Sequence, residues 1–276
     1  MKTVVYTVDV EPDVQPFSHG TTFGLENGLP ALFDLLEEVA VPADFFFLGS
    51  ALSKHAWAAR RAASSGHGIG SHGWSHEYLC QMDVARQVRE INQATTAIEQ
   101  ASGERPIMFR AADFSISGFA LEHLARSGYR LDSSIMPGRC ARRWRLFKIY
   151  DHRGAPLRPY RPSREDLRAP GELPILEMPV ALNRSRLGTP LGTAYLNAFG
   201  IDRTLHEIRT YPENIVVLLT HPWELVDLGG LVQGLPEGYS RGCSSDLGGL
   251  RKFFLRLQTE ADLSTLCAVE NEWMRG

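Results

Sequence analysis

Two histidines four residues apart, His72 and His76, form the clearest chemical pattern in the chain, within the stretch Gly-Ser-His-Gly-Trp-Ser-His-Glu. Imidazole nitrogen is the commonest protein ligand of zinc-like ions. A third ligand is expected from the amino terminus, where an apolar segment leads into three carboxylates at alternating positions, Asp9, Glu11 and Asp13. Together these stretches predict a metal site of two imidazoles and one carboxylate, with a spare carboxylate beside it.

A metal ion with three protein ligands keeps an open position, as catalytic sites do. Such an ion activates water near neutral pH and polarises a carbonyl group. An amine leaving group would also need a proton, and His221 is the expected general acid. Arg110 is expected to hold the base carboxylate ionised through a bidentate pair, and Asp132 to restrain Arg110 or to tune His221.

The elements that must position these groups alternate between strand-length apolar runs and amphipathic helical stretches, which indicates repeated β-α units around a parallel sheet or barrel. Strands are predicted at 4–8, 43–48, around 69, and at 107–109, 129–131, 175–180, 215–220 and 263–269. Helices are predicted from residue 30 through 39, at 51–65, after an N-cap at Asp83 as far as Gly103, at 119–126, near 205–209 and through 250–257.

In parallel α/β folds, functional groups gather at the carboxyl ends of the strands. Five predicted strands end in such groups: Asp9 and Glu11, His72 and His76, Arg110, Asp132, and His221. Each residue alone could be a helix cap or a solvated loop residue. Their coincidence at five strand ends favours one catalytic rim.

Composition limits the alternatives. The chain has 276 residues, 43% of them hydrophobic and 22% charged, which suits an ordinary globular protein with a large core. We interpret residues 1–276 as one domain, in which the Arg- and Pro-rich segment 139–170 is an insertion over the core. The net charge of −3 argues against a nucleic-acid partner. Four scattered cysteines form no CxxC pair and indicate neither a disulfide framework nor a thiolate zinc site.

The apolar run at the amino terminus is too short for a signal peptide, because it meets Asp9 after only a few residues. No later segment reaches the roughly 18 apolar residues that a membrane span needs. We therefore expect a cytoplasmic protein without a transmembrane segment.

Six motifs in order resemble those of the NodB-homology polysaccharide deacetylases, carbohydrate esterase family four, in the branch found in surface-polysaccharide and O-antigen gene clusters. The motifs are Val8-Asp9-Val10-Glu11, Ser71-His72-Gly73-Trp74-Ser75-His76, Phe109-Arg110-Ala111-Ala112-Asp113-Phe114-Ser115-Ile116, Leu131-Asp132-Ser133-Ser134-Ile135-Met136-Pro137, Glu177-Met178-Pro179 and His221-Pro222-Trp223-Glu224. They span nearly the whole chain.

The resemblance implies a distorted (β/α)7 barrel, like a TIM barrel, and metal-dependent removal of an acyl group from an amino sugar. It implies that Asp9 is the base, that Glu11, His72 and His76 bind the metal ion, and that His221 is the acid. A divalent ion is expected as cofactor, and zinc suits this ligand set.

Two departures from the family pattern stand out. The family has adjacent aspartates where Val10 here separates Asp9 from Glu11, so whether Asp9, Glu11 or Asp13 reaches the metal stays open. Ala112 also replaces the proline expected after Arg-Ala.

The expected substrate is an N-acetylated amino sugar, linked to a nucleotide or to a lipid diphosphate, on its way into a surface polysaccharide. The arginines of segment 139–170 suit recognition of a diphosphate, although such a run is more often a solvated surface. Three alternatives remain: a deformylase of a lipid-linked formamido sugar, a catalytically silent carbohydrate-binding or scaffold relative, and an amidohydrolase of substrates other than sugars.

Overall fold

The computed structural model describes residues 1–14, 17, 20–143, 147–185 and 188–275. The strands are β1 (Lys2–Val10), β2 (Asp44–Phe47), β3 (Gly68–Ser71), β4 (Met108–Phe109), β5 (Leu131–Asp132), β6 (Cys140–Arg143), β7 (Phe147–Asp151), β8 (Leu176–Glu177), β9 (Ile215–Thr220) and β10 (Ala261–Ser264). The α-helices are α1 (Leu29–Glu38), α2 (Leu52–Ser64), α3 (Val84–Ser102), α4 (Gly118–Arg126), α5 (Thr193–Phe199), α6 (Ile201–Thr210), α7 (Leu228–Leu231), α8 (Glu237–Ser240), α9 (Gly248–Glu260) and α10 (Leu266–Trp273).

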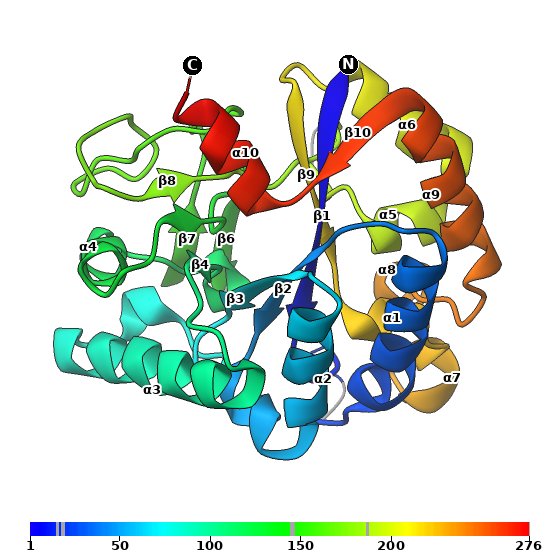
Figure 1. The fold of residues 1–276 in the computed structure, drawn as a ribbon, viewed down its shortest axis with the longest axis horizontal. Coiled ribbons are helices and arrows are strands. Elements are labelled where there is room, and N and C mark those ends of the chain that lie inside the picture. The colour runs from blue at the N-terminus through cyan, green and yellow to red at the C-terminus, as the bar shows by residue number, and fades with distance from the viewer. Residues whose placement is uncertain (15–16, 18–19, 144–146, 186–187, 276) are drawn as a thin grey trace.

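The main sheet is parallel and its strands pair in the order β10-β1-β2-β3-β4-β5-β8. Strand β9 pairs with β1 on the edge opposite to β2. Its two ends meet through isolated parallel bridges, Val180 to Val217 and Gly192 to Leu219. In the described part of the chain, seven strands therefore curl into a barrel, and β10 is added beside the first half of β1 (Figure 1). The predicted distorted (β/α)7 barrel is confirmed.

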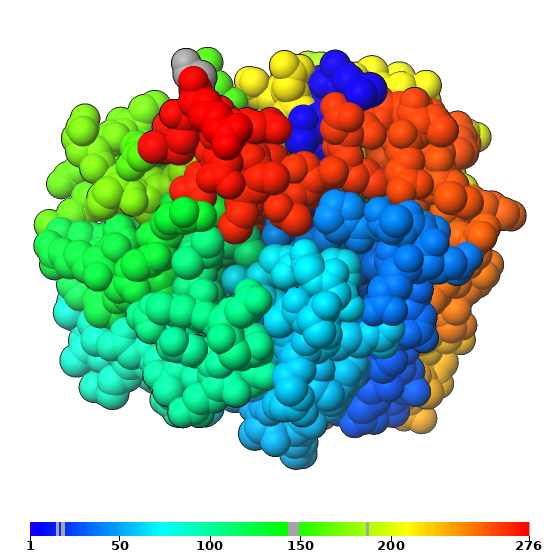
Figure 2. Space-filling view, viewed as in Figure 1, coloured from blue at the N-terminus to red at the C-terminus, as the bar shows by residue number. Residues whose placement is uncertain are grey.

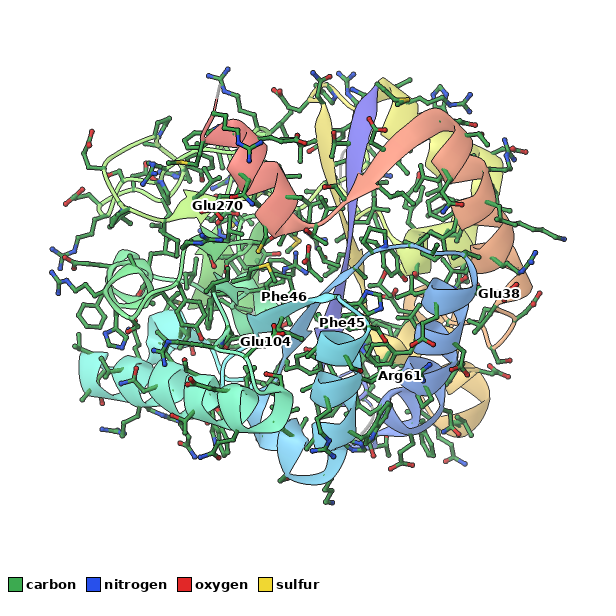
Figure 3. The ribbon with its side chains drawn as sticks, viewed as in Figure 1. Glu38, Phe45, Phe46, Arg61, Glu104 and Glu270 are labelled. Atoms are coloured by element: carbon green, nitrogen blue, oxygen red, sulfur yellow. The ribbon has the colours of Figure 1, made fainter. Side chains whose placement is uncertain are left out.

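Neighbouring residues of β2 serve two different cores, because side chains alternate across a strand. Phe45 packs outward on Phe33 of α1, with ring centroids 4.7 Å apart. Phe46 points to the opposite side, into the apolar filling of the barrel (Figure 3). This alternation ties the helices to the barrel and brings the ring of Phe46 under the catalytic rim.

Most predicted elements are present, and several ends are as expected. The side chain of Asp83 accepts a hydrogen bond from the Arg86 backbone amide at the start of α3, and Gly103 ends that helix with φ +81°. One prediction is wrong. Residues 263–269 were expected to form a strand, but β10 ends at Ser264 and Thr265 caps helix α10 by accepting from the Ala268 backbone amide.

The insertion carries an antiparallel hairpin of β6 and β7, followed by irregular chain that leads to β8. Its residues 144–146 lie outside the described part of the chain. The C-terminal residues lie at the molecular surface beside the N-terminal residues (Figure 2). Within the described residues, no helix is both long and apolar enough to cross a membrane.

Candidate metal centre and catalytic rim

Glu11, His72 and His76 converge at the carboxyl ends of β1 and β3. The Glu11 Oε2 atom lies 3.1 Å from His72 Nε2 and 2.5 Å from His76 Nε2. One ligand atom from each residue falls within 4.8 Å of the others. His76 adopts a left-handed backbone with φ +60°, an uncommon conformation for a residue other than glycine, and this conformation turns its ring back toward Glu11.

A backbone carbonyl fixes the tautomer of His72. Its Nδ1 lies 2.8 Å from the carbonyl oxygen of Arg110, which can only accept, so Nδ1 carries the proton. The neutral ring then presents a lone pair at Nε2 toward the Glu11 carboxylate. The two atoms lie 3.1 Å apart, so either a proton or a metal ion must lie between them. The donor set of two imidazoles and a carboxylate, with this carbonyl behind one imidazole, fits a zinc-like ion.

The charges of the cluster also favour the binding of a divalent cation. Burial alone would lower the pKa of His76, but the charge and hydrogen bond of Glu11 raise it to about 9. Burial alone would raise the pKa of Glu11, yet His76 and His72 hold that pKa well below its usual range. The cluster therefore stabilises positive charge between its carboxylate and its imidazoles, where a divalent ion can replace the protons.

Asp9 faces a buried arginine rather than the imidazoles. The Arg110 Nη1 atom donates to Asp9 Oδ1 and to the Thr7 hydroxyl, both at 2.8 Å. Its other nitrogens donate to the carbonyl and hydroxyl oxygens of Ser133, and the guanidinium lies 4.4 Å from the centroid of Phe46. The pair between Arg110 and Asp9 has one nitrogen on one oxygen, whereas the sequence predicted a bidentate pair.

His221 approaches the cluster from β9. Its Nε2 lies 3.8 Å from Glu11 Oε1, and its Nδ1 lies 2.7 Å from Glu224 Oε1. Burial alone would lower the pKa of His221, but Glu224, through its hydrogen bond and its charge, and then Glu11 raise it to about 9. The Trp223 ring stacks on His221 with centroids 4.8 Å apart. A Cβ on Gly24 would lie 2.3 Å from the Trp223 backbone nitrogen, so a close approach of two backbones fixes this segment.

The structure separates the three amino-terminal carboxylates. Asp13 is buried and accepts from the Thr21 hydroxyl and from the backbone amides of Phe23 and Gly24, so it orders the loop before α1. Asp9 pairs with Arg110, and Glu11 alone of the three joins the two imidazoles.

Asp132 lies within electrostatic reach of Arg110, whose charge lowers its pKa, but its hydrogen bonds go to other groups. Its carboxyl accepts from the Ser134 hydroxyl and faces Glu177, its register partner on β8. Burial raises the pKa of both carboxyls, and the negative charge of Asp132 raises the pKa of Glu177 further. Ser134 also accepts from the Ala111 backbone amide. Asp132 thus supports the segment after Arg110 but hydrogen-bonds to neither Arg110 nor His221 among the described residues.

Sequence reasoning missed two carboxylates at the rim. Glu224 follows His221 by three residues, and that spacing within one helical turn was the available signal for their contact. Asp113 Oδ2 lies 3.9 Å from His76 Nδ1. Asp113 and Phe114 both have positive φ, of 49° and 58°, directly after the alanine that replaces the expected proline, and no sequence signal announces this turn.

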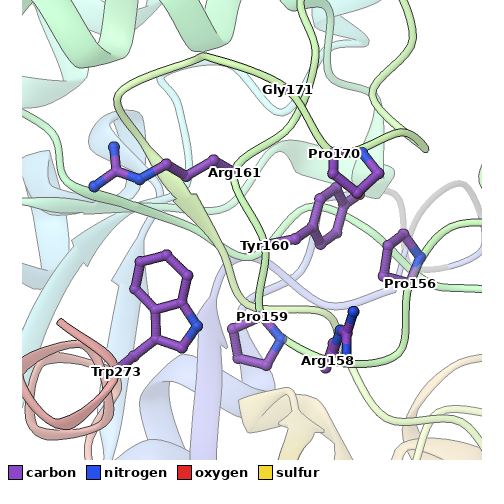
Figure 4. Close-up of a pocket in the computed structure, with 8 residues that line it drawn as sticks. All are labelled: Pro156, Arg158, Pro159, Tyr160, Arg161, Pro170, Gly171 and Trp273. Atoms are coloured by element: carbon purple, nitrogen blue, oxygen red, sulfur yellow. The ribbon is translucent and has the colours of Figure 1, made fainter. Parts of the chain in front are cut away.

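Several arginines of the insertion pair with a nearby acid or line a pocket away from the rim. Arg153 pairs with Asp151 and Arg168 with Asp166. Arg158 and Arg161 line an open pocket of about 520 Å³ with Trp273 of α10 (Figure 4). Helix α10 follows β10, which pairs with the first residues of β1, so this pocket lies at the end of the barrel opposite the metal cluster (Figure 1). Arg158 and Arg161 are therefore too far from the rim to bind a diphosphate there.

Comparison with known proteins agrees with this geometry. Residues 1–131 match the family model described as polysaccharide deacetylase. The peptidoglycan deacetylase of Helicobacter pylori is 26% identical over 114 residues, which cover 41% of this chain and 39% of the relative. The chitin deacetylase of Pestalotiopsis is 34% identical over 103 residues, which cover 36% of this chain and 35% of the relative. The match thus spans well under half the length of either relative.

The fold match extends further along the chain. A solved structure from Mycobacterium smegmatis with a polysaccharide deacetylase description superposes with a TM-score of 0.66 at 21% identity. It covers 98% of this chain and 89% of that one, and this likeness shows the shared fold. The family model covers just under half of the chain, so these comparisons show that the chain is similar to polysaccharide deacetylases and shares their barrel fold.

Proposed function

We propose that the protein is a metal-dependent N-deacetylase that hydrolyses the amide of an N-acetylated amino sugar. Three groups of side chains that suit this reaction lie together at one rim, and this is the main support for the proposal. They are the ligand cluster of Glu11, His72 and His76, the carboxylate of Asp9 held by Arg110, and His221 backed by Glu224.

In the proposed mechanism each side chain has one task. A divalent ion, when bound by Glu11, His72 and His76, polarises the amide carbonyl and lowers the pKa of water. Asp9 accepts a proton from the attacking water, while Arg110 keeps its carboxylate ionised and fixed. His221 holds a proton at Nε2 and gives it to the departing amine as the C–N bond breaks. Glu224 stabilises the imidazolium through Nδ1.

Zinc is our proposed ion, because two imidazoles and a carboxylate are a ligand set typical of catalytic zinc. The named relatives act on peptidoglycan and chitin, which supports an N-acetylated carbohydrate as the substrate class. We propose a nucleotide- or lipid-linked sugar precursor of a surface polysaccharide as the particular substrate. The cytoplasmic location expected from the sequence stays a prediction.

The test is metal content by elemental analysis on the wild type and on the double variant His72→Ala/His76→Ala, with amine release measured on N-acetyl and N-formyl amino sugars. His206→Ala is the matched control, because His206 is exposed on α6. We expect about one metal ion per chain in the wild type and the control, lost in the double variant together with amine release.

Release from the N-formyl sugar alone would favour the deformylase. A metal-free wild type without turnover after reconstitution would contradict the proposal and favour a silent carbohydrate-binding relative.

A further inference from the structure

We propose that Arg139, together with Tyr150 and Tyr239, forms a subsite beside the metal cluster for an oxyanion carried by the substrate. This inference rests on the proposed deacetylase function and narrows its substrate class to sugars with a phosphoryl or carboxylate group.

A rigid turn places Arg139 at the rim. The segment Met136-Pro137-Gly138-Arg139 follows β5, and the Arg139 amide donates to the Met136 carbonyl at 3.1 Å. Gly138 has φ +88°, and proline precedes it, as a type II turn requires. The His152 amide donates to the Arg139 carbonyl at 2.7 Å and locks the turn to the end of β7. The guanidinium thus starts from a fixed backbone, which suits a binding residue.

Two tyrosines from different segments lie near Arg139: Tyr150 shares a side-chain hydrogen bond with it, and Tyr239 lies within reach of its charge. The Tyr150 ring, on β7, lies 6.5 Å from the Phe114 ring, next to Asp113 in the chain. The Tyr239 ring, on α8, lies 6.1 Å from the ring of Trp223, which stacks on His221. The aromatic rings therefore lead from the proposed acid His221 toward this subsite.

The pKa values of the two tyrosines respond to the same pair of charges. Burial raises both, the negative charge of Asp113 raises both further, and the positive charge of Arg139 lowers both. Arg139 also lowers the pKa of Tyr150 through a side-chain hydrogen bond. Both hydroxyls therefore lie within electrostatic reach of Arg139 and of Asp113, which itself lies 3.9 Å from the ligand His76.

The charge of Arg139 has no protein counterpart in the described part of the chain, since no carboxylate there forms an ion pair with it. By contrast, Arg153, Arg164 and Arg168 each pair with an acid. A half-buried guanidinium with two hydroxyls within reach of its charge offers several donors, which suits phosphate or carboxylate oxygens. Asp113 is directed at His76, so it leaves the guanidinium available to a ligand.

The experiment compares Arg139→Gln with the matched variant Arg158→Gln, which alters an arginine in the pocket at the far end of the barrel. The substrates are N-acetylglucosamine 1-phosphate, N-acetylmuramic acid and neutral methyl N-acetylglucosaminide. For Arg139→Gln we expect at least a tenfold fall in kcat/KM for an anionic substrate, expressed mainly in KM, and a much smaller fall for the neutral substrate. The anionic substrate that is affected identifies the phosphoryl or the carboxylate source. Arg158→Gln should leave all three values at wild-type levels.

An equal loss on anionic and neutral substrates would overturn the inference, because Arg139 would then only balance the charge of Asp113. The inference would also be overturned if Arg139→Gln left the ratio of kcat/KM for the anionic substrates to kcat/KM for the neutral substrate unchanged. Binding of N-acetylglucosamine 1-phosphate and of N-acetylmuramic acid, measured by calorimetry, separates this inference from the proposed function. Tenfold weaker binding of either ligand to Arg139→Gln supports the subsite even without turnover. Equal binding of both ligands to the two proteins, or no binding of either to the wild type, contradicts it.

Discussion

The Nδ1 atom of the metal-ligand candidate His72 donates to the backbone carbonyl of Arg110 at 2.8 Å. The same residue that holds the Asp9 carboxylate through its side chain therefore orients an imidazole through its main chain. A shift of the segment after β4 would disturb both the proposed base and the metal cluster, so the two halves of the site are mechanically coupled.

Replacing Arg110 by methionine should strongly destabilise the fold, because it leaves the carboxylate of Asp9, which is 1% exposed, without a partner. Loss of one partner of a buried ion pair costs about 3 to 5 kcal/mol. Urea unfolding followed by circular dichroism measures the change. The double variant Arg110→Met/Asp9→Asn should recover part of the loss. A single variant within 1 kcal/mol of the wild type would show that the pair adds little.

Asp9→Asn and Asp132→Asn should differ sharply in activity. Loss of a general base typically lowers the rate by about 10² to 10⁴-fold, and we expect Asp9→Asn to fall in this range while it keeps its metal ion. Asp132→Asn keeps an oxygen that can accept from Ser134, so its kcat should stay within a few-fold of the wild type. The measurements are kcat and metal content. Equal losses in the two variants would return Asp132 to a catalytic role.

His152 should make the fold less stable in acid. Burial lowers its pKa from 6.5 to about 4, and its Nδ1 accepts from the Met136 amide, which requires an unprotonated nitrogen. This contribution is fully present above pH 6.5 and is lost as the pH falls through about 4. Since each pH unit between these values is worth about 1.4 kcal/mol, the loss approaches about 3 kcal/mol. Unfolding free energies of wild type and His152→Asn should diverge over this range, and parallel curves would contradict the assignment.

Asp44 should make the fold less stable as the pH rises, the opposite of the effect of His152. Burial raises its pKa from 3.8 to about 7, its Oδ2 accepts from the Leu266 amide, and its Oδ1 has no hydrogen-bond partner among the residues that the structure describes. A raised pKa means that this contribution is fully present below pH 3.8 and is lost as the pH rises through about 7. Asp44→Asn cannot ionise, so its stability relative to the wild type should increase from pH 4 to pH 8. Thermal melts across that range test this, and a constant difference would exclude it.

Gly24→Ala should displace the segment that carries His221, although Gly24 is not itself a residue of the site. The added Cβ would lie 2.3 Å from the Trp223 backbone nitrogen, so the segment of His221 must move. Overpacking of this kind costs about 1 to 3 kcal/mol, and we also expect a fall in kcat. Gly249→Ala is the control, because its added Cβ on α9 meets nothing within 4 Å and should stabilise the helix by up to about 1 kcal/mol. Equal behaviour of the two variants would refute the close approach.

Elements with strong local signals could be predicted from the sequence. The strand 215–220 is a run of β-branched and leucine residues and has the predicted bounds. Helix α3 follows from a capping aspartate and a terminal glycine. The run 263–269 failed because short apolar segments fit strand or helix equally well, and the cap at Thr265 decided for a helix.

At the site, the sequence named the ligand and acid candidates but not their partners. Whether Asp9, Glu11 or Asp13 faces the imidazoles depends on the direction of each side chain at the end of β1, and the irregular loop beyond the strand removes the simple alternation. The contact of Asp113 with His76 depends on the positive φ of both Asp113 and Phe114. The sequence Ala-Asp-Phe gives no clear signal for two consecutive residues in this conformation.

The central position of β1 has a consequence for how the chain acquires its fold. Thr7 pairs with Asp44, but Thr3 pairs with Ile215 and Lys2 with Ala261, so most of the ladder on the first strand comes from the last part of the chain. Such distant pairing is slow, because a long loop must close before its contacts form. During synthesis we therefore expect one edge of β1 to stay unpaired until β9 emerges, and the first residues of the other edge until β10 emerges. Glu11 lies just beyond that strand, so we expect the metal centre to form late in folding.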